Sequence, residues 1–358
     1  MTVDAVNLEE LEALARARLP EPAYHYFAGG AGDEITLREN RDAFARLSLV
    51  PRVLRGSQER STAVSAAGLR LTTPALVAPI AYQKVAHPDG ELATARAAAT
   101  TGVAMCLSSL SNSSLEDVVA AAGDDATLLF QLYPYRDRGM TDEIVRRAHG
   151  LGFRALVITV DVAVHGRRER ELRHAFALPA DCGLPCVPVP PDHVGPVSPR
   201  DVTSLMQPEL GWRDIERFAG LSDLPVILKG VLSRDDARIA ADVGAAGIVV
   251  SNHGGRQLDT APATIDVVGE IADDVGDRID VLVDGGVRRG TDVVKAVALG
   301  ARAVLVGRPV LWALAAGGEA GVRHALELLR AEIAEAFALA GCGSPAEATP
   351  ALVRRSGR

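Results

Sequence analysis

A histidine and an arginine stand three positions apart in the stretch SNHGGRQLD at residues 251–259. The stretch follows an apolar, β-branched run at residues 247–250, which we expect to form a buried strand. Two glycines between His253 and Arg256 allow a sharp bend, so both side chains can turn toward one small ligand. An imidazole can accept a proton and a guanidinium can hold a carboxylate. Taken alone, the pattern also fits a solvated polar loop.

Composition limits the classes of function. The chain has 358 residues, of which 48% are hydrophobic and 23% charged, as in an ordinary globular protein with a large core. A net charge of −8 and a pI near 5.6 argue against binding to a nucleic-acid backbone. Residues 1–10 lack the features of a signal peptide, and no apolar run has the length of a membrane span. We therefore expect a cytoplasmic protein without nucleic-acid or membrane partners.

Four cysteines, Cys106, Cys182, Cys186 and Cys342, are too few for a disulfide framework in a chain of this length. Cys182 and Cys186, with His193 nearby, could begin a metal site. A complete four-ligand spacing is missing, so we expect no metal.

Short apolar runs rich in β-branched residues recur eight times, at residues 76–80, 103–107, 128–132, 155–160, 225–228, 247–250, 281–283 and 303–306. Helical patterns lie between them, for example at residues 91–101, 114–121, 141–151, 233–243 and 290–299. Alternating strands and helices imply parallel pairing, and eight units favour a closed (β/α)8 TIM barrel. An open doubly wound sheet would be expected to carry a Gly-x-Gly-x-x-Gly turn after its first strand, and residues 79–83 do not form one.

We interpret residues 1–358 as one domain with additions to the barrel at 75–340. Residues 1–74 form an N-terminal extension with a helical stretch at 8–18. The longest irregular segment, at 162–211 after the fourth strand, is rich in proline and is expected to act as a lid-like loop. Residues 341–358 form a C-terminal tail.

Polar or turn-forming residues stand at the end of each predicted strand. They are Pro79, Ala81, Ser108, Ser109, Gln131, Tyr133, Thr159, Asp161, Lys229, Ser251, His253, Asp284, Gly307 and Arg308. In a barrel these ends converge on the face where enzymes of this fold keep their chemistry. The lysine among them could form a Schiff base or provide a fixed positive charge beside a cofactor.

Two glycine and arginine turns follow the last two strands. The first, DGGVRRG at residues 284–290, precedes a helical pattern, and the second is Gly307-Arg308. Glycines let backbone N–H groups approach a ligand closely, and a helix N-terminus attracts anions. Barrels often bind a phosphate between these two loops, so we expect a phosphate site there.

With these residues assembled, the chain resembles the FMN-dependent 2-hydroxy-acid oxidase and dehydrogenase family, which includes glycolate, lactate and mandelate-oxidising enzymes. The resemblance covers nearly the whole chain. It rests on residues 24–30 (YHYFAGG), 33–40 (DEITLREN), 86–91 (AHPDGE), 130–133 (FQLY), 251–259 and 307–309 (GRP). It implies a TIM barrel that binds FMN and assembles as a homo-oligomer, a tetramer in the family.

The resemblance also implies roles at the reacting end of the site. His253 is the expected base, which removes a proton as the substrate's α-carbon is oxidised, and Asp161 stabilises its imidazolium. Tyr133 is expected to act beside them. The substrate's carboxylate and hydroxyl are expected to bind two arginines and two tyrosines, namely Arg168, Arg256, Tyr26 and Tyr133.

The expected cofactor site divides into three groups. Lys229 matches the lysine beside the N1/O2 edge of the flavin, which favours a fixed charge over a Schiff base. The flavin ring and ribityl chain are expected to contact Pro79, Ile80, Ala81, Ser108, Gln131, Thr159 and Ser251. The ribityl and phosphate groups are expected to contact Asp284, Gly285, Gly286, Val287, Arg288, Gly307 and Arg308.

Two departures from the family pattern concern the substrate's side chain. Leu110 stands where plant-type glycolate oxidase has a tryptophan, and residues 161–168 lack the usual proline. A smaller residue leaves room for a bulky or aromatic 2-hydroxy acid. Tyr82 together with Leu110 resembles the hydroxymandelate oxidase branch.

The sequence therefore predicts an FMN enzyme that oxidises an L-2-hydroxy acid to a 2-oxo acid and passes the electrons to O2, giving H2O2. A dehydrogenase that uses a quinone or another acceptor is the nearest alternative, although Ala81 resembles the oxidases where a mandelate dehydrogenase has glycine. A flavin isomerase acting on a diphosphate and a flavin-binding protein without turnover are further alternatives.

Overall fold

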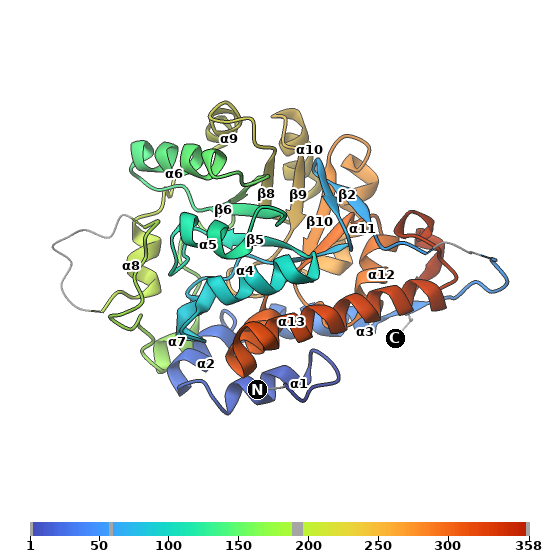
Figure 1. Ribbon diagram of the computed structural model, residues 1–358. Coiled ribbons are helices and arrows are strands. Elements are labelled where there is room, and N and C mark those ends of the chain that lie inside the picture. Colours follow the sequence, from blue (N-terminus) through green and yellow to red (C-terminus); the bar gives the residue numbers. More distant parts are fainter. Residues whose placement is uncertain (1–2, 57–59, 188–195, 356–358) are drawn as a thin grey trace.

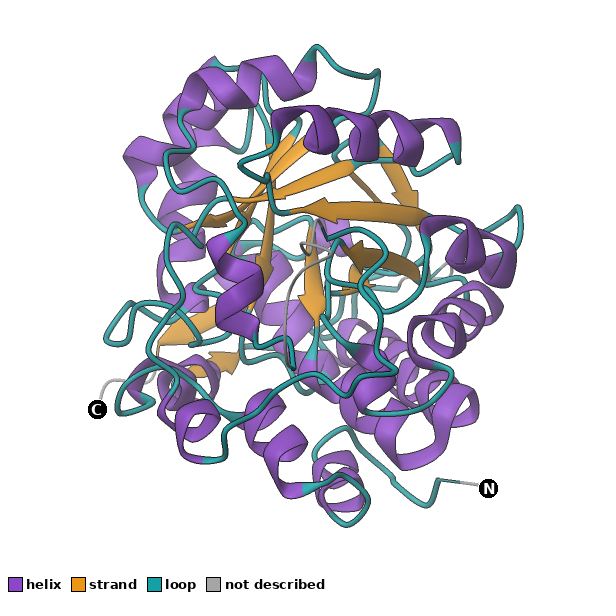
Figure 2. Ribbon diagram, turned by 90° about the vertical axis from the view of Figure 1, so that its left-hand side faces the viewer, coloured by secondary structure: helices purple, strands orange, loops and turns teal. Residues whose placement is uncertain are grey.

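The computed structural model describes residues 3–56, 60–187 and 196–355, and it confirms the predicted barrel. Eight parallel strands close into a ring in the order β10-β11-β4-β5-β6-β7-β8-β9, with helices around it (Figure 2). The strands are β4 (Ala75–Val77), β5 (Ala104–Ser108), β6 (Leu128–Leu132), β7 (Leu156–Thr159), β8 (Val226–Val231), β9 (Gly247–Val250), β10 (Asp280–Asp284) and β11 (Ala303–Val306). The ring closes where Val306 of β11 pairs with Val77 of β4.

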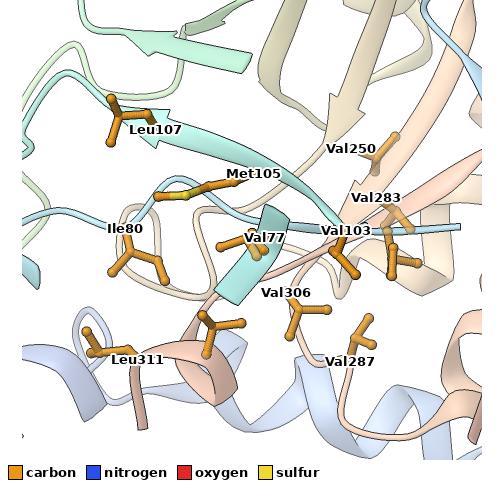
Figure 3. Close-up of a cluster of buried hydrophobic side chains, with 14 of the residues drawn as sticks. Val77, Ile80, Val103, Met105, Leu107, Val250, Val283, Val287, Val306 and Leu311 are labelled. Atoms are coloured by element: carbon orange, nitrogen blue, oxygen red, sulfur yellow. The ribbon is translucent and has the colours of Figure 1, made fainter. Parts of the chain in front are cut away.

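Alternation along these strands separates two apolar layers. Cys106 of β5, Leu129 of β6 and Ile227 of β8 belong to a cluster inside the ring. Their neighbours point outward, and Figure 3 shows two of them, Met105 and Leu107. Burial of each large apolar side chain contributes about 1.5–3 kcal/mol, so both layers stabilise the ring.

The outer helices are α4 (Gly90–Thr101), α5 (Leu115–Ala122), α6 (Arg138–Gly150), α9 (Trp212–Ala219), α10 (Arg234–Asp242), α11 (Thr264–Val275), α12 (Gly290–Ala298) and α13 (Arg308–Leu339). The predicted strand and helix ends differ from these bounds by no more than three residues. The first strand ends at Val77 rather than at residue 80, because Pro79 has no N–H for the ladder. Helix α6 begins three residues earlier than predicted, since the Asp137 side chain caps it by accepting from the Met140 N–H.

The N-terminal extension contributes α1 (Glu10–Arg16), α2 (Glu21–Ala28) and α3 (Ile35–Ala45). Helix α1 packs against α13 (Figure 1). The hairpin of β2 (Val64–Ala66) and β3 (Leu69–Leu71) joins the cluster inside the ring. Strand β1 (Leu47–Leu49) pairs with β12 (Val353–Arg355), which ties the extension to the C-terminal tail. The sequence analysis did not predict these two small sheets.

The segment at 162–211 is less irregular than predicted. It contains α7 (Glu169–Arg173) and α8 (Pro199–Ser204), and a capping box at Ser198 and Asp201 starts the second helix. A β-bridge between Tyr135 and Met206 holds the segment against the loop after β6. His193 lies outside the described residues.

Among the helices that the structure describes, none is long and apolar enough to cross a membrane.

Gly290 allows α12 to approach α13 closely. A Cβ atom there would lie 2.2 Å from the carbonyl carbon of Glu332. We expect Gly290→Ala to lower the free energy of unfolding by about 1–3 kcal/mol, because backbone atoms of α13 would have to move. Urea denaturation measures the change. Gly150→Ala is the matched control, because its Cβ meets nothing within 4 Å and α6 gains alanine's helix propensity. Equal midpoints for the two variants would contradict this packing.

Candidate active site

His253, Asp161 and Tyr133 meet at the carboxyl end of the barrel. The Nδ1 atom of His253 lies 3.0 Å from Oδ1 and 3.2 Å from Oδ2 of Asp161. The carboxylate can only accept, so Nδ1 carries the proton and the lone pair of Nε2 is available. Nε2 lies 3.4 Å from the hydroxyl of Tyr133. The imidazole is therefore held in the tautomer that a base requires.

The electrostatic surroundings keep this histidine neutral. Burial lowers the pKa of His253, and Asp161 offsets only part of that effect. Burial raises the pKa of Asp161, but interaction with His253 and with the positive charge of Lys229 outweighs burial, so the net pKa lies below its usual value. A neutral base beside an ionised carboxylate is ready to take a proton, and the imidazolium that forms is stabilised.

The loop after β9 turns sharply through three residues with positive φ angles, namely 57° at His253, 63° at Gly254 and 77° at Gly255. A Cβ atom at Gly255 would lie 2.6 Å from the backbone nitrogen of Leu37. The left-handed conformation is costly for histidine, and such strain gathers at functional sites. The second glycine is required by the close approach of the N-terminal extension.

Arg256 lies in the cavity wall beneath α2. Its guanidinium donates to the carbonyls of Tyr26 and Gly29 at 2.6 and 2.9 Å, and it lies 4.8 Å from the centre of the Tyr26 ring. Burial and the neighbouring Arg168 lower the pKa of Arg256 to about 10. Its hydrogen bonds to the described residues go to neutral carbonyls, so an anionic ligand would be stabilised here.

Arg168 is buried and is not among the residues that line the cavity. It donates to the carbonyl of Arg256 and to the side chain of Gln257, both at 3.1 Å. Glu171 lies 3.6 Å from Arg168 and accepts a hydrogen bond from Nε2 of His165 at 3.1 Å. Arg168 thus supports the backbone of Arg256. Its predicted contact with the substrate's carboxylate stays a prediction.

The inward positions of the strands change from apolar to polar at the mouth of the barrel. Ser108 donates to Gln131 at 3.0 Å, and Gln131 donates to Thr159 at 3.0 Å. Each polar residue stands two positions after an apolar residue inside the ring, so period-two alternation brings them to one layer. Gln131 thus orients Ser108 and Thr159. Its predicted contact with the flavin stays a prediction.

Lys229 occupies the same layer. Its ammonium contacts Ser251 and Asp284, both at 2.9 Å, and Ser251 also lies outside the cavity lining. Burial lowers the pKa of Lys229, but Asp284 and Asp161 outweigh burial, so the net pKa is raised. A Schiff-base lysine needs a lowered pKa, so this geometry supports a fixed positive charge.

The two arginine turns face each other at the far end of the cavity. Arg308 donates to the carbonyls of Phe27, Gly254 and Gly29. Burial and the charges of Arg256 and Arg288 lower its pKa to about 9. Two neighbouring guanidinium groups that lower the pKa of a third favour binding of a multivalent anion.

Gly286, two residues before Arg288, has a φ of 90° and lets the N-terminal extension approach this turn closely. A Cβ atom there would lie 1.9 Å from the carbonyl oxygen of Asn40. The Oδ1 atom of Asp284 is buried without a hydrogen-bond partner among the described residues. An unsatisfied carboxylate oxygen requires a donor, such as a hydroxyl of a bound ligand.

Most of these groups border one cavity, part of which is open to solvent. An anion clamp, an orphaned carboxylate oxygen and a buried lysine together fit a phosphorylated, hydroxyl-bearing cofactor. The predicted residues in its wall are Tyr26, Pro79, Ile80, Ala81, Ser108, Leu110, Tyr133, Thr159, Lys229, His253, Arg256, Asp284, Gly285, Gly286, Val287, Arg288, Gly307 and Arg308.

A comparison with protein families identifies this cofactor. The family model for FMN-dependent dehydrogenases matches residues 15–355. The chain belongs to the FMN-dependent dehydrogenase family. It is therefore a flavin oxidoreductase with FMN as its cofactor, and the predicted resemblance is confirmed.

Several relatives in this family are known by activity. An L-lactate oxidase from Nostoc sp. is 47% identical over 345 residues, which cover 94% of each chain. A peroxisomal (S)-2-hydroxy-acid oxidase from Oryza sativa subsp. japonica is 45% identical over 355 residues, 98% of this chain and 96% of the relative. A solved structure of mandelate oxidase with (S)-4-hydroxymandelic acid has a TM-score of 0.91 and 46% identity, covering 96% of this chain and 97% of that one.

The sequence analysis missed several apolar and backbone positions in the cavity wall, including Phe27, Gly254, Leu305 and Leu311. Leu305 and Leu311 lie within three residues of the Gly307-Arg308 turn in the sequence. This proximity could have indicated that they border the cavity. Phe27 gives no such signal, because α2 reaches the cavity only through tertiary packing.

Arg288 provides a test of the phosphate end. We expect Arg288→Met to weaken FMN binding by about ten- to a hundredfold, because a charge-assisted hydrogen bond contributes roughly 1.5–3 kcal/mol. Riboflavin binding should change little, since riboflavin has no phosphate. Fluorescence quenching during titration of the apoprotein measures both affinities. The neighbouring Arg289→Met is the control, because Arg289 pairs with Glu332 at 3.2 Å and is exposed. Equal loss of both flavins in Arg288→Met would contradict a phosphate contact.

Proposed function

We propose that this FMN-dependent dehydrogenase family member oxidises an L-2-hydroxy acid to a 2-oxo acid and passes the electrons to O2, giving H2O2. One observation carries the proposal. A neutral histidine backed by a carboxylate shares a cavity with an arginine that forms no ion pair with a carboxylate among the described residues. A 2-hydroxy acid offers both matching groups, a carboxylate for Arg256 and a removable proton beside it for His253.

The residues divide the work. Arg256 holds the substrate's carboxylate, and the hydroxyls of Tyr26 and Tyr133 bind its polar groups. Nε2 of His253 then takes a proton, and Asp161 stabilises the positive charge that forms on the imidazole. FMN, when bound, accepts the two electrons that the α-carbon loses. Lys229 holds a positive charge in the polar layer below, where it would stabilise negative charge arriving on the cofactor.

Oxygen is the proposed acceptor because three relatives of nearly full coverage are named oxidases. A quinone-dependent dehydrogenase would use the same reducing half of the site and differs only in what reoxidises the flavin. A flavin-binding protein without turnover would leave the His253–Asp161 pair without a role. In a diphosphate isomerase, the carboxylate clamp at Arg256 would have no role.

The side-chain pocket supports a bulky substrate. Leu110 lines the cavity, and its carbonyl accepts from the backbone N–H of Tyr82 at 3.1 Å, which fixes the loop after β5 beside that ring. Tyr26 stacks on Phe176 with ring centres 4.2 Å apart, and Tyr82 lies 5.8 Å from Tyr26. These aromatic rings and Leu110 form apolar surroundings that suit a phenyl or branched side chain.

The predicted cytoplasmic location, lid-like loop and homo-oligomer stay predictions.

His253→Gln tests the base. We expect the variant to retain FMN and to reduce it with substrate at least about 10²–10⁴-fold more slowly, because glutamine cannot accept the proton. Anaerobic stopped-flow absorbance of the flavin measures this step directly. In the unmodified enzyme, kcat/KM should fall as pH decreases through an apparent pKa below ~6.5, since the neutral imidazole is the active form and burial lowers its pKa. Wild-type reduction rates in His253→Gln would assign the base to another residue.

Leu110→Trp tests the substrate's side chain. Each buried methylene contributes roughly 0.8 kcal/mol, so we expect a mandelate-type acid to exceed glycolate by about two orders of magnitude in kcat/KM. The tryptophan should fill the space and reduce this preference. Peroxide release is measured with glycolate, L-lactate, a longer aliphatic acid and (S)-mandelate on both proteins. If the unmodified enzyme preferred glycolate, the prediction of a pocket for a bulky side chain would be wrong. Turnover without peroxide would indicate the dehydrogenase.

A further inference from the structure

Two histidines stack outside the cavity, where α2 meets α7. His25 lies on α2 and His174 is the C-cap residue of α7, and the two helices lie side by side (Figure 1). The ring centres are 3.9 Å apart and the planes differ by 2°. Face-to-face imidazoles at this distance repel when both are protonated, so at least one ring is held neutral.

A carboxylate faces the same edge of the stack. Glu21 precedes His25 by one helical turn on α2. Its Oε1 atom lies 3.8 Å from Nε2 of His25 and 3.9 Å from Nδ1 of His174. Both separations are too long for hydrogen bonds. The other ring nitrogen of His25, Nδ1, is buried and has no hydrogen-bond partner among the described residues. Three side chains of types that ligate metals therefore meet at one edge of the stack, and the carboxylate forms no hydrogen bond with either imidazole.

The distances fit a shared ion. One ligand atom from each of the three residues lies within 4.8 Å of the others. Ligand atoms around a tetrahedral Zn²⁺ at 2.0–2.2 Å are roughly 3.3–3.6 Å apart, only a few tenths of an ångström shorter than the two carboxylate distances. Glu21 is 74% exposed and is free to make this adjustment. Since the rings are parallel, one of them must also turn about its Cβ–Cγ bond to direct its lone pair at the ion.

Two neighbouring arginines, Arg170 and Arg16, already have partners. Arg170 on α7 pairs with Glu34 at 2.6 Å, and the guanidinium of Arg16 lies over the ring of Tyr24 at 5.0 Å. Burial and the nearby His174 lower the pKa of His25. A neutral imidazole is the form that binds a metal.

We propose that Glu21, His25 and His174 form a binding site for a divalent transition-metal ion of the Zn²⁺ type, which cross-links α2 to α7. Two imidazoles and one carboxylate make an N/O donor set that suits such ions, and water supplies the remaining ligand. The sequence concealed this site, because its third ligand is distant in the chain and no spacing motif connects it.

The position gives the site a structural consequence. Helix α2 carries Tyr26 in the cavity wall, and α7 begins directly after Arg168. An ion that joins the two helices would therefore hold together the elements that cover the carboxylate clamp. It would bind the folded chain and not the unfolded one, and so raise its stability in proportion to its concentration.

The test uses the untagged, FMN-loaded enzyme, because a histidine tag would itself bind the ion. Isothermal titration with ZnCl2 at pH 7.5 in a non-coordinating buffer should give one ion per chain. We expect binding to weaken at least tenfold in His174→Ala and in His25→Ala. His149→Ala is the matched control, since His149 is a single exposed histidine on α6, and it should bind Zn²⁺ as the unmodified enzyme does.

Thermal unfolding provides a second readout that does not depend on activity. The midpoint should rise with Zn²⁺ concentration in the unmodified enzyme and in His253→Gln, and stay constant in His174→Ala. Glu21→Gln changes an exposed side chain and should also bind Zn²⁺ more weakly. This variant tests the site if His25→Ala fails to fold. No titration heat in the unmodified enzyme, or undiminished binding in His174→Ala and Glu21→Gln, would overturn the proposal.

Discussion

The register of the barrel strands is the constraint on which the rest of this molecule depends. In a parallel strand every second side chain points inward, and neighbouring strands hold one another in register through the ladder. Inside the ring, apolar residues such as Cys106, Leu129 and Ile227 form the core. Two positions later the same inward direction is occupied by Ser108, Gln131 and Lys229. A slip of one residue in any strand would turn its polar group toward the helices and break the layer that faces the cofactor.

The cavity above this layer is electrostatically incomplete without a ligand. Arg256 and Arg308 donate to backbone carbonyls and form no ion pair with a carboxylate among the described residues, and burial lowers the pKa of both. We propose that anions stabilise both ends of this positive site, a phosphate near Arg308 and a carboxylate near Arg256. In this proposal the same charges favour both FMN and an acidic substrate. Lys229 is the exception, because Asp284 neutralises it.

The N-terminal extension completes the site and is not merely an addition to the barrel. Asn40 and Asn252 exchange hydrogen bonds at 2.8 and 2.7 Å, and the N–H of Ala31 donates to the carbonyl of Gly255 at 2.8 Å. These bonds fix the strained turn that carries His253. The extension therefore links the position of His253, the proposed base, to the position of Tyr26, a proposed substrate ligand.

Sequence by itself determined the barrel and most of the cavity wall. Alternating patterns identified eight strands, and the rule that functional residues follow barrel strands selected His253, Lys229 and Asp284 before any contact was visible. The family assignment followed from the order of the motifs. These inferences succeeded because local periodicity and strand ends are encoded by neighbouring residues.

Only the tertiary structure decided the contacts between distant segments. It joined Arg168 to Gln257, brought Phe27 into the wall, and stacked His25 on His174. Each of these depends on how α2 and α7 pack over the barrel mouth, which is set by the combined fit of many side chains. No spacing within the sequence carries that information, because packing joins residues through space and local periodicity reports only on residues close together in the chain.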